Sequence, residues 1–409
     1  MKVLYLTYDG LTDGLGRSQV IPYLEGIAAD GHEIIVLSFE KPDKTEHDKL
    51  VIRQLLEKPK IDWEPLTYTS SPPVLSTVYD ILSLRKKCRS LHKEIGFDVV
   101  HCRSYITSLV GLHLKRRFGI KLIFDMRAFY ADERVDGGLW PQTSFVFRAV
   151  YNYFKKKEKS FLSEADYTIS LTTKGKEVIH SWNDIENQPI PIEVIPCCAD
   201  LDHFNPRNVD VEAKTALKNK LGLNGSELVL TYLGSIGTWY MLDEMLDFFK
   251  VLHSKKPESR FFFITLDDSK MILEAAKQKG IPEELFIITP AAREEVPTYL
   301  SLADIAFFFI KPVFSKTGSS PTKHGEMLGM GIPVICNGNV GDMSSIVPGS
   351  GTGIVVESFD QTAYLQAVNQ IDALLKTPPE TCQKLADEIY SLKTGVKRYQ
   401  GVYRALKKQ

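Results

Sequence analysis

Short apolar runs alternate with longer segments of helical periodicity along the whole chain. The runs are continuous rather than alternating, as at residues 34–37, which is typical of strands covered on both faces of a sheet. Segments of helix length lie between them, and one of these, residues 17–30, ends at Gly31, where a left-handed cap residue is favoured. This rhythm predicts right-handed βαβ units and an α/β fold with parallel sheets.

The strand-like runs fall into two sets. In the first half we expect strands at residues 3–8, 34–39, 99–101, 121–125, 167–171 and 194–196. In the second half we expect them at residues 228–234, 261–265, 286–289, 305–310, 333–337 and 353–356. A polar, lysine-rich stretch, residues 200–225, separates the sets. The pattern therefore predicts two Rossmann-like domains, residues 1–205 and residues 206–389.

The last segment, about residues 390–409, has the pattern of an amphipathic helix. Its apolar face carries Tyr399, Val402, Tyr403 and Leu406. Such a helix needs an apolar surface to cover. By sequence it belongs to the second domain, and crossing back to the first is the alternative.

Composition narrows the class of protein. A chain of 409 residues is too long for one ordinary core, and its 44% hydrophobic residues are ordinary for a folded protein. The formal net charge of -1 argues against a nucleic-acid partner. No run reaches the roughly 18–20 apolar residues that cross a bilayer, and the first run is too short for a signal peptide. We expect a cytoplasmic protein.

The cysteine pattern also favours a cytoplasmic protein. None of the six cysteines forms a Cys-x-x-Cys pair or has a histidine at zinc-finger spacing. Scattered thiols fit a reducing compartment, and we predict no metal site.

Two small-residue turns follow strand-like runs at equivalent places in the two halves. The first contains Gly14 and Gly16, and the second contains Gly234 and Ser235. Glycine lets the backbone approach a ligand, and the helix that follows offers free N–H groups at its start. Ligands of open α/β sheets bind at this edge. A purely structural turn is the alternative at both places, and two glycines fall short of the dinucleotide-binding fingerprint.

Residues 319–333 form the most informative segment. Ser320 is predicted to cap a short helix on which Thr322, Lys323 and Glu326 share one face. An ammonium there suits a phosphate, and a carboxylate suits a ribose. An ordinary Lys–Glu pair on a solvated face is the alternative, but the apolar residues that follow indicate a buried neighbourhood and favour a ligand site.

Several short motifs accompany these segments. They are Gly31-His32-Glu33-Ile34, Asp98-Val99-Val100-His101, Asp202-x-Phe204-Asn205-Pro206, Tyr232-Leu233-Gly234-Ser235 and Pro321-Thr322-Lys323. Together they resemble the family-4 retaining glycosyltransferases of the GT-B fold over most of the chain. The resemblance implies two domains that face each other across a cleft and a terminal helix that crosses back to the first domain.

The resemblance also implies the reaction. A nucleotide-sugar, linked to UDP or GDP, would donate its sugar with retained configuration to a glycan or lipid-linked acceptor, without a cofactor or metal. Glu326 would bind the donor's ribose, and the turn at Gly234 and Ser235 would face its diphosphate.

Two departures from the family pattern affect the donor side. The family motif has two glutamates, and the earlier position is Gly318 here, so backbone N–H groups around Gly318 and Ser320 would have to contact the transferred sugar. The cations that commonly follow the second turn are replaced, with Tyr240 or Met241 near the usual lysine position. Lys323 is the candidate for the missing positive charge.

A second polar cluster ends two strands of the first half. Arg127 suits a phosphate or an anionic acceptor, because a guanidinium binds oxyanions in a bidentate way. Asp125 would orient Arg127 or the acceptor. His101 matches a histidine of the family, while Arg103 stands where many members have a second histidine. We assign His101, Asp125, Arg127 and Lys323 to the catalytic site; a structural ion-pair network is the alternative for Asp125 and Arg127.

Residues 140–159 combine aromatic with basic side chains. On a helix this composition suits an anionic membrane surface at the inner face and a lipid-linked acceptor. Core aromatics beside a solvated lysine face are the alternative.

Two other functions are weighed against transfer. One is a nucleotide-sugar epimerase, which needs acidic groups for proton abstraction that the sequence does not identify. The other is a catalytically reduced sugar-nucleotide-binding subunit, for which Gly318 is the best argument.

Overall fold

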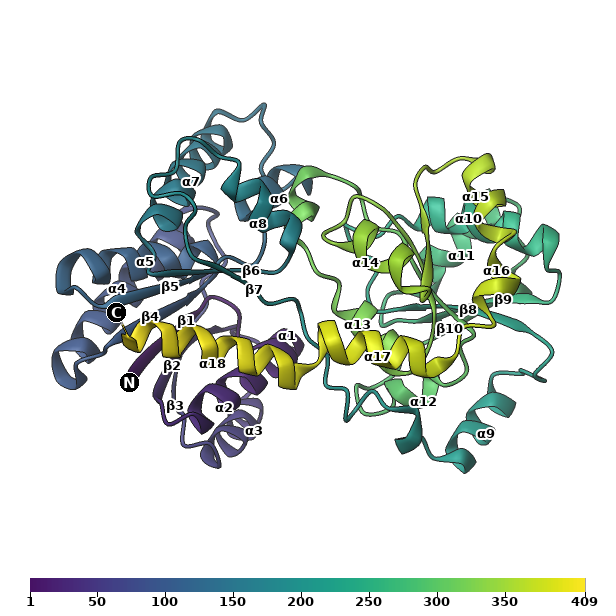
Figure 1. The fold of residues 1–409 in the computed structure, drawn as a ribbon, viewed down its shortest axis with the longest axis horizontal. Helices are drawn as coiled ribbons and strands as arrows, with labels where there is room; N and C mark the ends of the chain where they lie inside the picture. Colours follow the sequence, from purple (N-terminus) through teal and green to yellow (C-terminus); the bar gives the residue numbers. More distant parts are fainter. Residues whose placement is uncertain (409) are drawn as a thin grey trace. The chain divides into compact units, whose positions relative to one another are not determined.

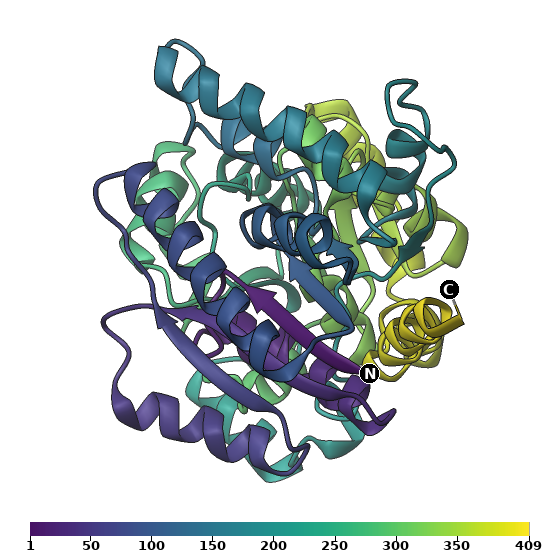
Figure 2. The same ribbon diagram turned by 90° about the vertical axis from the view of Figure 1, so that its left-hand side faces the viewer.

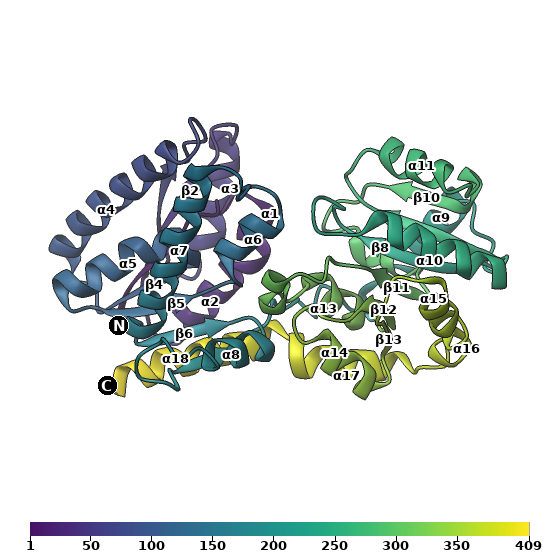
Figure 3. The same cartoon turned by 90° about the horizontal axis from the view of Figure 1, so that it is seen from above.

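The computed structural model describes residues 1–408, which divide into two compact units. The first unit comprises Met1–Pro196 together with the residues from Leu392 onward, and the second comprises Cys197–Ser391. Each unit is built on one parallel sheet with helices around it (Figure 1) (Figure 3). The predicted α/β fold with two Rossmann-like domains is confirmed.

Both sheets are parallel at every neighbouring pair of strands. The first has the order β3-β2-β1-β4-β5-β6-β7 and consists of β1 (Lys2–Thr7), β2 (Glu33–Glu40), β3 (Asp62–Thr67), β4 (Val99–Arg103), β5 (Lys121–Asp125), β6 (Tyr167–Ser170) and β7 (Ile192–Val194). The second has the order β10-β9-β8-β11-β12-β13 and consists of β8 (Leu228–Leu233), β9 (Ser259–Ile264), β10 (Phe286–Thr289), β11 (Ile305–Phe308), β12 (Val334–Asn337) and β13 (Gly353–Val356).

Helices cover these sheets. In the first unit they are α1 (Gly14–Gln19), α2 (Ile21–Ala29), α3 (Glu46–Glu57), α4 (Leu75–Ile95), α5 (Ser104–Phe118), α6 (Tyr130–Asp136), α7 (Phe145–Glu164), α8 (Thr173–His180) and α18 (Leu392–Lys408). In the second they are α9 (Val211–Lys220), α10 (Leu242–Lys255), α11 (Ser269–Gln278), α12 (Val296–Leu300), α13 (Thr322–Gly329), α14 (Met343–Ser350), α15 (Gln361–Val368), α16 (Ile371–Leu374) and α17 (Pro379–Tyr390), with 3-10 turns at Pro206–Asn208, Glu283–Leu285 and Phe314–Gly318. Within residues 1–408 none of the helices has the length and apolar character to cross a membrane.

The continuous apolar runs form central strands that are buried on both faces, and every residue of β8 and β12 is buried. The sequence pattern missed β3, because Asp62, Glu64 and Pro65 interrupt its apolar residues. These residues fit because β3 is an edge strand, and an edge position tolerates charge and proline.

Two predicted boundaries differ from the structure. The predicted helix at residues 17–30 is two helices, because Val20 leaves helical geometry and Pro22 lies in the first turn of a new helix, where it needs no N–H partner. The boundary between the units lies after Pro196 rather than after residue 205. The intervening residues join the second unit, since Ala199 N donates to Tyr390 O at 2.8 Å and Phe204 packs in the second core.

The C-terminal helix α18 packs against α2 in the first unit (Figure 1). It begins at Leu392, two residues after α17 ends, and the last residue of the predicted helix, Gln409, lies outside the described residues. Gly26 makes the approach of the helices possible, because a Cβ there would lie 2.3 Å from a methyl carbon of Val396. Polar contacts fix the register: Gln400 Nε2 donates to Gly26 O at 2.8 Å, and Arg404 pairs with Asp30 at 3.1 Å.

We expect Gly26→Ala to destabilise the first unit by about 1–3 kcal/mol, because the added methyl overpacks the α2–α18 contact. Val396→Ala combined with Gly26→Ala should recover most of the loss, since it removes the clashing methyls. Gly401→Ala is the matched control: it lies in α18 with open space around it and should stabilise by about 0.5–1 kcal/mol. Urea unfolding followed by circular dichroism measures all three. An additive double mutant would contradict the assigned contact.

Candidate functional site

A buried carboxylate holds the backbone of the first glycine turn, which contains Gly14 and Gly16. Glu40, at the end of β2, accepts hydrogen bonds from the backbone N–H groups of Leu11 at 2.8 Å and Thr12 at 3.1 Å, and from the hydroxyls of Thr12 and Ser38. Both carboxylate oxygens are thus used to shape the loop. Glu40 therefore acts structurally.

The two glycines of this turn differ in what the fold requires. A Cβ at Gly16 would lie 2.4 Å from the carbonyl oxygen of Gly10, so this position needs glycine for packing. Gly14 has nothing within 4 Å of such a Cβ and opens to free space. Asp13 beside it pairs with Lys41 at 3.0 Å and Lys44 at 3.2 Å. Of the two glycines, Gly14 is therefore the one with room for a ligand.

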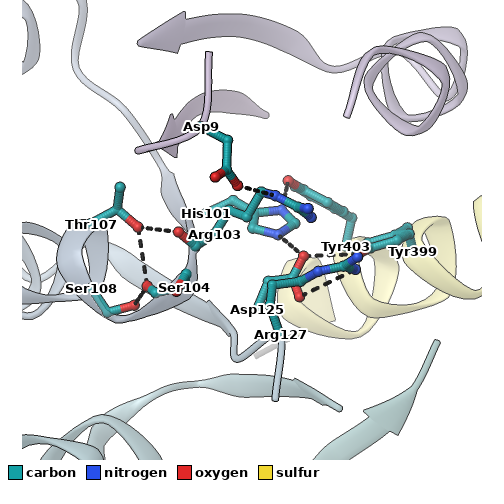
Figure 4. A network of polar contacts seen from close by, with 10 residues as sticks. All are labelled: Asp9, His101, Arg103, Ser104, Thr107, Ser108, Asp125, Arg127, Tyr399 and Tyr403. Carbon is teal, nitrogen blue, oxygen red and sulfur yellow. Dashed lines mark hydrogen bonds and ion pairs between the residues drawn. The ribbon is translucent and has the colours of Figure 1, made fainter. Parts of the chain in front are cut away.

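The carboxyl ends of β4 and β5 carry the predicted polar cluster, which α18 covers (Figure 4). His101 and Asp125 are fully buried, and Nε2 of His101 lies 3.7 Å from Asp125 Oδ2. Tyr403 OH lies 2.8 Å from Nδ1 of His101, and Tyr399 OH donates to Asp125 Oδ2 at 2.9 Å. Arg127 Nη1 lies 4.0 Å from Asp125 Oδ1. The structure thus brings His101, Asp125 and Arg127 together.

Opposing effects set the charge states in this cluster. Burial alone raises the pKa of the Asp125 carboxyl, but Arg127 and then His101 more than reverse that effect, so the pKa lies below its usual range. Burial lowers the pKa of His101. The cluster therefore holds an ionised Asp125 against a neutral imidazole at neutral pH. Since a carboxylate only accepts, we assign the imidazole hydrogen to Nε2, with Tyr403 donating to Nδ1.

The backbone beside this cluster is strained. Arg127 has φ 52° and Ala128 has φ 76°, in the left-handed region that L-residues avoid. Ser104 has φ 69° directly after β4. At the end of β4, Arg103 Nε donates to Asp9 Oδ2 at 3.2 Å (Figure 4). Two guanidinium groups therefore lie at this edge of the sheet, at the positions where ligand-binding residues of such sheets are found.

In the second unit, Asp267 holds the Gly234–Ser235 turn. Ser235 Oγ donates to Asp267 at 2.9 Å, and the N–H of Ile236 donates to the same carboxylate at 2.6 Å. Gly234 has φ 98°, which favours glycine strongly. The Ser235 side chain is thus turned toward Asp267, and it is the backbone at Gly234 that faces Lys323. A Cβ at Gly234 would lie only 3.5 Å from Lys323 Nζ.

Lys323, in the predicted donor site, is buried beside two tyrosine rings. Its Nζ lies 3.7 Å from the ring centroid of Tyr240 and 4.1 Å from that of Tyr232. The ammonium is buried and has no hydrogen-bond partner among residues 1–408. Burial lowers its pKa well below the usual value, and Glu326 and Asp267 offset only part of that effect. Two aromatic faces partly compensate a cation, but they supply no acceptor.

Glu326 lies one turn further along α13, and a residue that the sequence did not single out accompanies it. Arg293 Nη1 lies 3.6 Å from Glu326 Oε1, and the guanidinium stacks on the Phe204 ring at 5.5 Å. Burial raises the pKa of Glu326, while Arg293 and Lys323 oppose this rise. The structure thus brings Gly234, Lys323 and Glu326 into one neighbourhood in the second unit.

The start of α13 differs from the prediction. Pro321 is the N-cap residue, and Ser320 makes no capping hydrogen bond. The Ser320 hydroxyl accepts instead from the N–H of Cys197 at 3.3 Å. Ser320 thus fixes the segment before the helix, and Thr322, half-buried, is the first helical residue. Gly318 is buried in the preceding 3-10 turn.

The predicted membrane segment, residues 140–159, contains both buried and exposed side chains. Lys155 forms a partly buried ion pair with Asp132 at 2.8 Å and a second with Glu158, so it belongs to the interior of the unit. Phe154 is buried as well, whereas Phe145 is 83% exposed. Core packing thus accounts for one face of α7, and the apolar residues at its start remain on the surface.

Similarity to known proteins adds to this geometry. Residues 20–203 match the family model described as Glycosyltransferase Family 4, and residues 213–391 match Glycosyl transferases group 1. The chain is 25% identical over 334 residues to an alpha-monoglucosyldiacylglycerol synthase of Acholeplasma laidlawii, covering 80% of this chain and 77% of that protein.

Solved structures share the fold. A sucrose-phosphate synthase from Thermosynechococcus elongatus matches with a TM-score of 0.76 and 16% identity over 99% of each chain. Anabaena HepE in complex with UDP-glucose matches with a TM-score of 0.68 and 13% identity, over 99% of this chain and 100% of that one. The expected GT-B fold is confirmed.

We expect Lys323→Met to stabilise the second unit at neutral pH by about 1 kcal/mol, the usual gain when a destabilising functional group is replaced. The sign follows from proton binding: the unfolded chain keeps this lysine protonated up to its ordinary pKa of 10.5, whereas the folded unit releases the proton earlier. Wild-type stability should therefore rise toward the variant's as pH increases to about that value. Thermal unfolding at several pH values tests this, with Lys384→Met on the exposed face of α17 as control. A lower melting temperature for Lys323→Met would contradict the burial argument.

Proposed function

Because the chain belongs to the glycosyltransferases that combine a Family 4 domain with a group 1 domain, we propose that it transfers a sugar from a UDP- or GDP-linked donor to a glycan or lipid-linked acceptor and retains the anomeric configuration. The observation that carries the donor assignment is the buried, unpartnered ammonium of Lys323 beside the Gly234 turn. A desolvated cation without an acceptor is costly, and a diphosphate would supply both charge and oxygen acceptors.

The donor side follows from the neighbours of Lys323. Glu326 takes the ribose hydroxyls, with Arg293 holding its carboxylate in place at 3.6 Å. The backbone at Gly234 approaches the diphosphate, and Asp267 keeps that turn in shape. Free N–H groups at the start of α13, around Thr322, and of the segment at Gly318 and Ser320 contact the transferred sugar. HepE, which shares the fold, is in complex with UDP-glucose, and this supports a nucleotide-sugar donor.

The acceptor side lies in the first unit. Asp125 and His101 position the acceptor, and Arg127 contributes positive charge to stabilise the departing phosphate or to hold an anionic acceptor. Gly14 opens the first turn to the ligand. In a retaining reaction of this kind the acceptor attacks on the leaving-group face, and the protein's contribution is placement and electrostatic stabilisation of the diphosphate. We place the reaction in the cytoplasm, with peripheral contact to the membrane surface through residues 140–159.

Lys323→Gln should weaken binding of the preferred nucleoside diphosphate, UDP or GDP, by at least tenfold, because a hydrogen bond to a charged group contributes about 1.5–3 kcal/mol. Isothermal titration calorimetry measures the loss. Only the ammonium form binds a phosphate, so wild-type affinity should fall as pH rises, and binding should take up a proton where the free lysine is neutral. Titrations in two buffers of different ionisation enthalpy detect that proton.

The matched control is Lys384→Gln, whose side chain is 78% exposed on α17. It should leave affinity and proton uptake unchanged. Equal affinity of wild type and Lys323→Gln, with equal pH dependence, would remove the donor assignment. Incubation with nucleotide-sugars separates the other functions: transfer releases nucleotide when an acceptor is added, an epimerase alters the sugar without release, and a binding subunit does neither.

A further inference from the structure

A groove of about 910 Å³ lies wholly within the first unit, between α4 and α7. Helix α5 lies between these helices and contacts both of them (Figure 2). Its residues Ile106, Leu109 and Leu112 line the floor of the groove. From Ile106 to Arg116 the floor is about 15 Å long, because a helix rises about 1.5 Å per residue. The volume of the groove lies within the range of small-molecule sites.

One end of the groove lies at the edge of the sheet that carries the polar cluster. Tyr8 follows β1, Tyr68 follows β3 and Tyr130 follows β5, and all three line the groove. His101 and Asp125 lie in β4 and β5 at the same edge. A ligand in the groove therefore reaches the carboxyl ends of the strands, where the acceptor site is proposed.

The mouth of the groove is apolar and exposed. Leu82 and Leu139 line it and are each 57% exposed, and Tyr153 lines it and is 48% exposed. Close by in the sequence, at the start of α4 and of α7, Leu75 and Phe145 are also exposed. Proteins in water seldom leave so many large apolar side chains together on the surface unless a ligand or partner covers them.

The walls of the groove carry positive charge only. Arg85, Arg116, Arg134 and Lys157 line it together with His113, and its lining contains no aspartate or glutamate. Of the four cations only Arg116 forms an ion pair within the described chain, with Glu164. Burial lowers the pKa of His113, and Arg85, Arg89 and Arg117 lower it further, which reflects the excess of positive charge here. An occupant must therefore combine apolar surface with negative charge.

We propose that this groove binds the hydrocarbon chain of a phosphate-bearing lipid, and that the acceptor of the proposed transfer is linked to such a lipid. The inference rests on the proposed function and names its acceptor class. An extended hydrocarbon chain matches the length and apolar floor of the groove, and a phosphate matches Arg85, Arg134 and Lys157, for which no carboxylate partner is found among residues 1–408. The chain enters at the exposed mouth, and the sugar-bearing end reaches the strand ends.

The test uses the full-length protein with farnesyl phosphate, farnesol and inorganic phosphate as probes, titrated by calorimetry. Ala149→Trp should weaken farnesyl phosphate binding at least tenfold, because the exposed Ala149 lines the groove and an indole would fill it. Ala213→Trp, at an exposed position on α9, is the matched control and should bind like wild type. Farnesol should bind more weakly than farnesyl phosphate, and inorganic phosphate more weakly still.

Further variants and probes keep the result decisive. If Ala149→Trp does not fold, Leu82→Glu replaces it, with Leu55→Glu on the exposed face of α3 as its control. Equal farnesyl phosphate affinity in a folded groove variant and in wild type would overturn the proposal, as would equal affinity for inorganic phosphate. A further outcome is that the protein binds phosphatidylglycerol vesicles and not farnesyl phosphate. That result would show that the groove contacts a bilayer surface rather than binding a single lipid, and it would also overturn the proposal.

The same titrations separate this inference from the proposed function. UDP or GDP affinity should be unchanged in Ala149→Trp, since Ala149 belongs to the first unit and the proposed donor residues belong to the second. Nucleotide binding without any farnesyl phosphate binding would defeat the groove assignment alone. Farnesyl phosphate binding without nucleotide binding would defeat the transferase proposal.

Discussion

The burial of charged side chains beside the carboxyl ends of parallel strands is the constraint on which the site geometry depends. A buried charged group is stabilised by polar partners, changes its protonation state, or is neutralised by a bound ligand. The two units resolve this differently. Asp125 is surrounded by a tyrosine hydroxyl, an imidazole and a guanidinium, and it remains ionised. Lys323 has two tyrosine faces and, among residues 1–408, no acceptor, so its proton is held weakly.

This difference gives the two clusters different physical roles. The first is organised before any ligand arrives, because α18 supplies Tyr399 and Tyr403 to fix the acidic and imidazole groups. The second holds a buried ammonium, for which we propose an anionic ligand. Its polar neighbours already have other partners, since Ser235 is turned to Asp267 and Glu326 lies against Arg293. Pre-organisation in the first unit and a buried cation in the second suit the proposed transfer, in which a charged donor binds before the sugar is moved.

The sequence was sufficient for the fold where patterns are regular and insufficient where tertiary contacts decide. Continuous apolar runs predicted all six strands of the second sheet, because fully buried strands tolerate few polar residues. The edge strand β3 was not predicted, because its proline and acidic residues are acceptable only at the edge of a sheet. The role of Glu40 in holding the first glycine turn was not predicted, because its partners Leu11 and Thr12 lie almost thirty residues earlier in the chain. The convergence of Gly234, Lys323 and Glu326 was predicted, but Arg293 and Asp267 were not assigned to it, because nothing local in their segments reveals a distant partner.

The first unit is made from both ends of the chain, and this has a consequence for biosynthesis. A ribosome releases the strands of the first sheet long before it releases residues 392–408, while the second unit is continuous from Cys197 to Ser391. Domains generally fold as their residues emerge, so the second unit can complete its core while the first still lacks the helix that covers His101 and Asp125. A nascent or prematurely terminated polypeptide thus leaves an unshielded acid–imidazole cluster, and only the finished polypeptide can close it.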